Sequence, residues 1–114
     1  MKVTAPGEAV DQLERDLGLT SQELAQALGV SPATLGRWRA GETYPRHKAR
    51  QSLSQLVSLH ALLRKTFVGR EDIALWLNAQ NRYLGGLRPI EAIRVRRFDR
   101  VEAAIEALNA GIFA

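Results

Sequence analysis

Cysteine is absent from this chain of 114 residues. Its absence excludes disulfide bonds, thiolate metal sites and cysteine nucleophiles. Only two histidines are present, His47 and His60, and no glycine-rich nucleotide-binding motif occurs. We therefore expect a protein that is not an enzyme, with no catalytic residues, no metal site and no cofactor.

Long hydrophobic runs are also missing. No apolar run approaches the roughly 18 residues needed to cross a bilayer, and the first residues lack the apolar core of a secretory signal. We expect a cytoplasmic protein that does not bind membranes. No stretch shows the sustained alternation of a β-strand, so the fold class predicted is all-α.

Two short capped helices are predicted between Thr20 and Gly41. Thr20 and Glu23 have the spacing of a capping box, and Ser31 before Pro32 is an N-cap followed by a first-turn proline. Gly41 is placed to end the second helix. Apolar residues recur every three or four positions and give both helices a common core face: Leu24, Ala25, Leu28, Leu35 and Trp38. The pattern resembles the Xre and lambda-repressor type of helix-turn-helix, whose second helix enters the DNA major groove.

Positive charge is concentrated on and just after this second helix. The segment from Arg37 to Arg50 holds five Lys or Arg and one acid, Glu42, while the whole chain carries a net charge of +4. The rest of the chain therefore balances to zero. A solvated basic loop would have the same composition, but the coincidence with a helix-turn-helix favours a surface that contacts DNA phosphates.

The expected DNA contacts divide into base contacts and phosphate contacts. On the second helix, Ser31, Thr34 and Arg37 can hydrogen-bond a base edge, and Ala33 can touch a thymine methyl group. Phosphate contacts are expected at the start of the first motif helix and after the second: Ser21, Thr43, Arg46, Lys48 and Arg50. Because one such module contacts few bases, we expect a homodimer on a two-fold operator.

Three further residues in the first half have two interpretations each. Gly36 either allows a close approach to DNA or to another helix, or is simply tolerated. Arg39 is expected to reach a phosphate or to pair with Glu42. His60 is expected to be a packed or interface histidine rather than a metal ligand.

The remaining sequence predicts a chain in two parts. After a loose leader (1–7), helices are expected at 8–17, 46–65, 70–77, 89–94 and 98–108, with an irregular segment at 78–86. We divide the chain into a helix-turn-helix domain with a long connecting helix (1–65) and a small helical domain (66–114). About 48 residues are few for an independent core, so the second part is expected to need a neighbour or partner.

The segment from Trp76 to Pro89 reads Trp-Leu-Asn-Ala-Gln-Asn-Arg-Tyr-Leu-Gly-Gly-Leu-Arg-Pro. It resembles the toxin-binding domain of the Xre/MbcA/ParS antitoxin family, although Gln80 stands where the family often has proline. The matching positions are Trp76, Leu77, Asn81, Leu84, Gly85, Gly86, Pro89, Ile93, Val101 and Gly111.

This resemblance implies an antitoxin of a type II toxin–antitoxin system. Such a protein binds a RES-domain toxin that degrades NAD, blocks the toxin's active site and represses its own operon. The implied toxin-binding residues are Asn81, Gly85, Gly86, Arg100, Gly111, Ile112, Phe113 and Ala114.

Two alternatives to this interpretation remain. Asn81, Gly85 and Gly86 are most simply explained as structural turn residues, and Trp76 as a core residue. Phe113 either enters the toxin or covers the core of its own domain. The whole chain could also be a stand-alone helix-turn-helix regulator, with a second half that serves dimerisation or ligand sensing.

Overall fold

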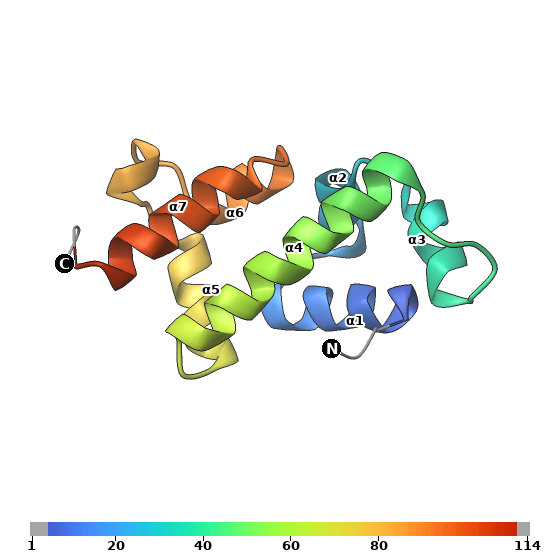
Figure 1. The fold of residues 1–114 in the computed structure, drawn as a ribbon, viewed down its shortest axis with the longest axis horizontal. Coiled ribbons are helices and arrows are strands. Elements are labelled where there is room, and N and C mark those ends of the chain that lie inside the picture. Colours follow the sequence, from blue (N-terminus) through green and yellow to red (C-terminus); the bar gives the residue numbers. More distant parts are fainter. Residues whose placement is uncertain (1–4, 112–114) are drawn as a thin grey trace.

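The computed structural model of the chain describes residues 5–111. Within that range it contains helices and turns and no β-strand, which confirms the all-α prediction (Figure 1). The elements are α1 (Pro6–Leu17), α2 (Ser21–Leu28), α3 (Pro32–Arg39), α4 (His47–Thr66), α5 (Arg70–Asn78), the 3-10 helix η1 (Arg82–Leu84), α6 (Pro89–Arg94) and α7 (Phe98–Asn109).

The long helix α4 runs diagonally through the molecule and joins its two ends (Figure 1). It packs against α1 and α2 of the first half and against α5 and α7 of the second. Leu56, Leu59 and Leu63 of α4 are fully buried, in a single apolar cluster that includes residues from both halves of the chain. The second half therefore shares a core with the first, as its small size predicts. The division at residue 65 stays a prediction.

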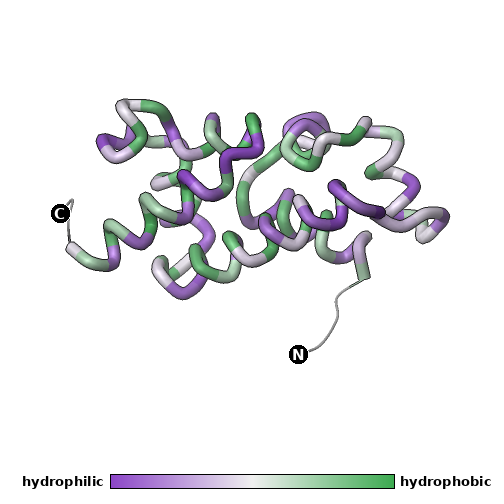
Figure 2. The backbone as a smooth tube through the Cα atoms, turned by 45° about the horizontal axis from the view of Figure 1, so that its top comes forward, coloured by the Kyte–Doolittle hydropathy of each residue, from purple (hydrophilic) through white to green (hydrophobic). Residues whose placement is uncertain are grey.

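The helix-turn-helix forms as the capping residues predict. Both hydrogen bonds of the Thr20–Glu23 capping box are present, and the Ser31 hydroxyl accepts the Thr34 N–H at 3.1 Å. Gly41 adopts a left-handed φ of 74°, and its N–H donates to the Trp38 carbonyl. Figure 2 shows hydrophobic and hydrophilic residues alternating along the helices, as expected of amphipathic helices packed on one core.

The first helix begins earlier than the sequence suggested. Pro6 and Gly7, assigned above to a loose leader, belong to α1, and Pro6 occupies a first-turn position. A Cβ on Gly7 would lie 3.1 Å from the Trp38 carbonyl oxygen and from the Cα of Arg39. Glycine therefore lets α1 approach the backbone of α3, a tertiary contact that no local pattern reveals.

An ion pair joins the two halves of the chain. Glu23 of α2 pairs with Arg94 of α6, and both side chains are partly buried. The Glu23 carboxylate also accepts the backbone N–H of Thr20 at 3.0 Å. The Thr20 N–H and then Arg94 hold the pKa of this carboxyl below its usual value, although partial burial opposes the shift.

We expect the ionised Glu23 to make stability depend on pH. Because its folded-state pKa is lowered, its contribution is present above the ordinary value of 4.5 and is lost as the pH falls through the folded value. Urea unfolding of Glu23→Gln should show a deficit of up to about 1 kcal/mol at pH 7 that becomes smaller at pH 3. Glu102→Gln, an exposed change on α7, serves as the control. A Glu23→Gln deficit of equal size at both pH values would contradict the prediction.

Candidate DNA-binding and partner-binding surfaces

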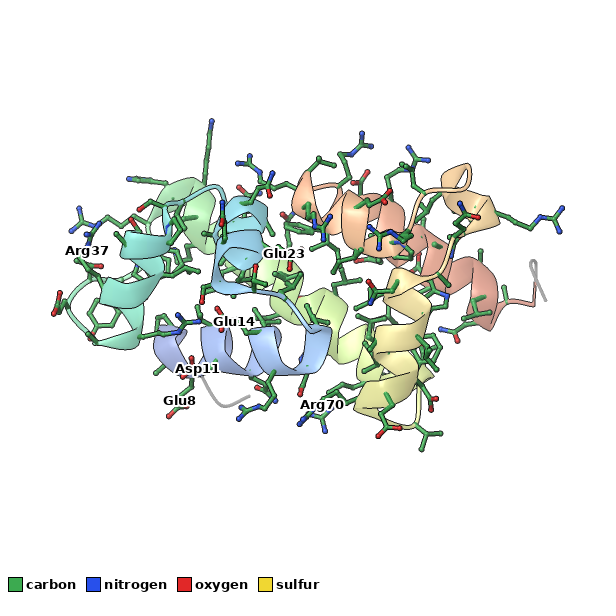
Figure 3. The ribbon with its side chains drawn as sticks, turned by 180° about the vertical axis from the view of Figure 1, so that it is seen from behind. Glu8, Asp11, Glu14, Glu23, Arg37 and Arg70 are labelled. Atoms are coloured by element: carbon green, nitrogen blue, oxygen red, sulfur yellow. The ribbon has the colours of Figure 1, made fainter. Side chains whose placement is uncertain are left out.

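The outer face of α3 is free of packing contacts. Leu35 and Trp38 are buried, whereas Ser31, Ala33 and Arg37 are exposed. Figure 3 shows the Arg37 side chain pointing away from the helix bundle. The face that the sequence assigned to base contacts is therefore open to solvent.

The three predicted hydrogen-bonding residues on this face are linked to one another. The hydroxyls of Ser31 and Thr34 lie 3.0 Å apart, and the Arg37 guanidinium donates to the Thr34 hydroxyl at 3.1 Å. The chain of bonds holds Arg37 along the helix surface. A side chain ordered before binding loses less conformational entropy when it contacts a base.

The structure shows the partners of the Arg39 side chain and the space around Gly36. Arg39 pairs with Asp11, at 2.8 Å, and with Glu14, both on α1. The expected pairing with Glu42 is wrong, because the guanidinium is turned toward α1. The alternative, a phosphate contact by Arg39, stays a prediction. A Cβ on Gly36 would meet nothing within 4 Å, so no other helix approaches it in the described chain.

Ser21 lies at the start of α2 but its hydroxyl faces inward. It donates to a carboxylate oxygen of Glu14 at 2.8 Å, and Arg39 approaches it at 3.4 Å. A phosphate contact by Ser21 would therefore use its backbone N–H at the positive end of the helix.

The other four predicted phosphate contacts lie in the loop after α3 and at the start of α4. Thr43, Arg46, Lys48 and Arg50 are all exposed, and none of their side chains makes a hydrogen bond or ion pair within residues 5–111. His47, beside them, is also exposed. This set provides three cations with no acidic partner next to α3, which suits contact with a polyanion.

In the second half, Asn81 builds the turn that precedes α6. Its side-chain oxygen accepts the Tyr83 N–H at 2.9 Å, its backbone N–H donates to Leu87, and its carbonyl accepts the Gly86 N–H. Gly85 and Gly86 have φ values of 70° and 94°, which other residues rarely adopt. The three residues thus have a structural role that is sufficient to explain them. Their contact with a toxin stays a prediction.

A groove of about 190 Å³ lies between this turn and α7. Its lining combines apolar and polar side chains: Trp76, Gln80, Asn81, Arg82, Tyr83, Ala104 and Leu108. Trp76, predicted to be a core residue, is only half-buried and contacts Phe67 with ring centroids 5.8 Å apart.

The remaining predicted toxin contacts lie on or after α7. Arg100 is exposed on the outer face of α7, and its side chain has no partner in the described range. Gly111 follows this helix with a left-handed φ of 75°. Ile112, Phe113 and Ala114 lie outside the described residues.

Within residues 5–111, no group of three potential metal ligands occurs, and no helix is long and apolar enough to span a membrane. His60 is buried, and its Nε2 lies 2.7 Å from a carboxylate oxygen of Asp16. The prediction that His60 packs in the interior is confirmed.

Comparison with known proteins matches each half of the chain to an antitoxin domain. Residues 4–62 match the family model of the antitoxin Xre-like helix-turn-helix domain. Residues 62–111 match that of the antitoxin Xre/MbcA/ParS C-terminal toxin-binding domain. The two matches meet within α4.

Relatives in Mycobacterium tuberculosis resemble nearly the whole chain. The mycobacterial cidal antitoxin MbcA is 31% identical over 97 residues, which is 85% of either chain. A second protein, named a probable mycobacterial cidal antitoxin, is 33% identical over 106 residues, covering 93% of this chain and 89% of the relative.

A solved structure has the same fold. A chain in the crystal structure of the M. tuberculosis MbcT–MbcA toxin–antitoxin complex superposes with a TM-score of 0.72 and 28% identity, covering 98% of this chain and all of that one. The family matches, the relatives and this structure agree with one another. The chain therefore belongs to the Xre/MbcA/ParS antitoxin family.

Proposed function

We propose that this chain is the antitoxin of a type II toxin–antitoxin system, located in the cytoplasm and without enzymatic activity of its own. It binds a RES-domain toxin that degrades NAD and blocks that toxin's active site. As a homodimer it also binds operator DNA and represses its own operon. The observation that carries the proposal is the joining, in one chain, of an open helix-turn-helix face to a toxin-binding domain of the antitoxin family.

The two proposed activities use different ends of the molecule. The DNA-contacting residues lie on α3 and at the start of α4, whereas Asn81 and Gly111 lie near η1 and just after α7, at the opposite end (Figure 1). Arg100, in the first turn of α7, lies nearer the middle of the molecule. The molecule is 45 Å long, and α4 runs diagonally through its middle. This separation allows one chain to hold a toxin and DNA at the same time.

The proposal is tested by co-expression with the protein encoded beside this chain's gene. The pair should co-purify, cells should survive only when both are made, and the complex should consume no NAD. A neighbour without NAD-consuming activity, or one that fails to co-purify, would favour a stand-alone regulator. In that case the second half would serve dimerisation or ligand sensing.

Arg37 is expected to contact a base, since it lies on the exposed face of α3 and is held by Thr34. Arg37→Ala should reduce the free energy of binding to the operator by about 1–3 kcal/mol and relax the base preference at one base pair in each half-site. Mobility shifts against a panel of operator variants measure this, with Arg46→Ala as the phosphate-contact comparison. If Arg37→Ala lost the same affinity on every sequence, Arg37 would be a phosphate contact.

The tail at residues 112–114 is expected to contact the toxin, with Phe113 as its apolar anchor. Removing these three residues should weaken toxin binding about tenfold or more, as loss of a buried aromatic anchor does. Calorimetric titration and an NAD-consumption assay measure the effect, and Arg50→Ala is the control. A truncated chain that still inhibits fully would contradict the prediction, and one that melts at a much lower temperature would instead place Phe113 on its own domain.

A further inference from the structure

The turn between α6 and α7, residues 94–97, lies against the turn of the helix-turn-helix. Helix α6 packs against α2, and Arg94 pairs with Glu23 of α2. The guanidinium of Arg96 lies directly over Gly29, which ends α2, so that a Cβ on Gly29 would collide with it. Residues nearly 70 positions apart in the sequence thus meet beside the DNA-binding motif (Figure 1).

Arg96 is the free cation of this turn. Its neighbour Arg94 is paired with Glu23, and Arg97 is paired with Asp99 at 3.2 Å. The Arg96 side chain is exposed and has no hydrogen bond or ion pair within residues 5–111. Its positive charge is therefore available to an anion from outside the chain.

The backbone of Arg96 adds a second observation. Its φ is 63°, in the left-handed region that favours glycine. It stands where glycine usually ends a helix: its N–H donates to Ile93, and the Arg97 N–H donates to Ala92. An arginine in this backbone conformation is strained, whereas a glycine would not be. The arginine differs from glycine in having a side chain, and that side chain lies over Gly29. Strained residues of this kind cluster at functional sites.

The position of Arg96 matches the expected course of the DNA backbone. Gly29 lies two residues before Ser31, the N-cap of α3. Arg96 also shares a polar groove of about 260 Å³ with Lys48 in the first turn of α4. It therefore lies near both the turn before the recognition helix, where base contacts are expected, and the start of α4, where phosphate contacts are expected.

We propose that Arg96 contacts a phosphate of the bound DNA duplex, beside the phosphates assigned to Arg46 and Lys48. The DNA interface then continues from the helix-turn-helix onto the α6–α7 turn of the toxin-binding half. This inference rests on the proposed DNA-binding function. It adds one phosphate contact for each bound chain and no base specificity.

The test uses Arg96→Gly, because glycine removes the charge and relieves the left-handed backbone. The affinity of the full chain for its operator duplex and for an unrelated duplex is measured by fluorescence anisotropy between 50 and 200 mM salt. Arg96→Gly should lower the affinity for both duplexes by the same factor. The slope of log K against log salt should become shallower by about 0.9 for each bound chain. Its melting temperature should be equal to or higher than that of the unchanged protein.

Three comparison variants make the outcome decisive. Arg96→Lys keeps the charge and should keep the slope, whereas Arg82→Gln, an exposed arginine of η1, should change nothing. Arg46→Ala reports whether phosphates are contacted at all. If Arg46→Ala lowers the slope and Arg96→Gly does not, this inference is overturned and the DNA-binding proposal stands. If the unchanged protein binds neither duplex, both are overturned.

A purely structural role for Arg96 predicts the opposite pair of results. Arg96→Gly would then lower the melting temperature, because the cover over Gly29 is lost, and would leave the salt slope unchanged. That combination also overturns the inference.

Discussion

Reversing the charges of Arg46 and Lys48 together, as Arg46→Glu with Lys48→Glu, is expected to weaken DNA binding by about 100-fold or more. Both side chains are exposed, and neither has an acidic partner in the described range. The substitutions remove two phosphate contacts and add two negative charges that face a polyanion. Because the lost contacts carry no sequence information, the affinities for operator DNA and for unrelated DNA should fall by the same factor.

Toxin neutralisation should survive this double reversal. Of the predicted toxin contacts, Asn81, Gly85, Gly86 and Gly111 lie around η1 and just after α7, away from the first turn of α4 (Figure 1). Survival of cells that co-express the toxin is the measurement. The matched control is Arg64→Glu with Lys65→Glu, which reverses two exposed charges in the last turn of the same helix. It should leave DNA binding intact. A folded Arg46 and Lys48 double variant that no longer protects cells would show that the two activities share a surface.

The face of α3 is the part of the site that the sequence predicts best. Its limits are set by local signals, the Ser31 N-cap and the left-handed Gly41, and its orientation is set by the buried pair Leu35 and Trp38. Signals of this kind act within one or two helical turns. They therefore need no knowledge of the remaining chain.

What the sequence misses depends on contacts between distant helices. Arg39 pairs with Asp11 and Glu14 on α1, and the Ser21 hydroxyl is directed to the same Glu14. Helical spacing shows which way a side chain leaves its own helix, but not which neighbour it meets. For the same reason the sequence assigns Arg39 to the DNA side or to Glu42.

Arg96 illustrates the second limit. Glycines mark left-handed turns in a sequence, and Gly41, Gly85 and Gly111 are recognised in this way. An arginine in the same conformation carries no such mark. Its place over Gly29 follows from the packing of α6 on α2, which only the folded structure reveals.

Substituting a buried side chain of α4 tests whether the two parts of the chain fold separately. Leu59 is 1% exposed and belongs to the single apolar cluster that contains residues from both halves. Leu59→Ala should lower the free energy of unfolding by about 2–5 kcal/mol, through lost apolar burial and the cavity left behind. For a chain of this size the melting temperature should fall by roughly 10 °C or more.

The two tryptophans report which half is affected, since Trp38 lies in α3 and Trp76 in α5. Fluorescence of Trp38→Phe and Trp76→Phe backgrounds follows each half alone. Because the core is continuous, both reporters should unfold in one coincident transition, with and without Leu59→Ala. Ser58→Ala, an exposed change one residue away, should leave that transition in place. Two transitions at different temperatures, with only one moved by Leu59→Ala, would instead show two domains that fold independently on a shared helix.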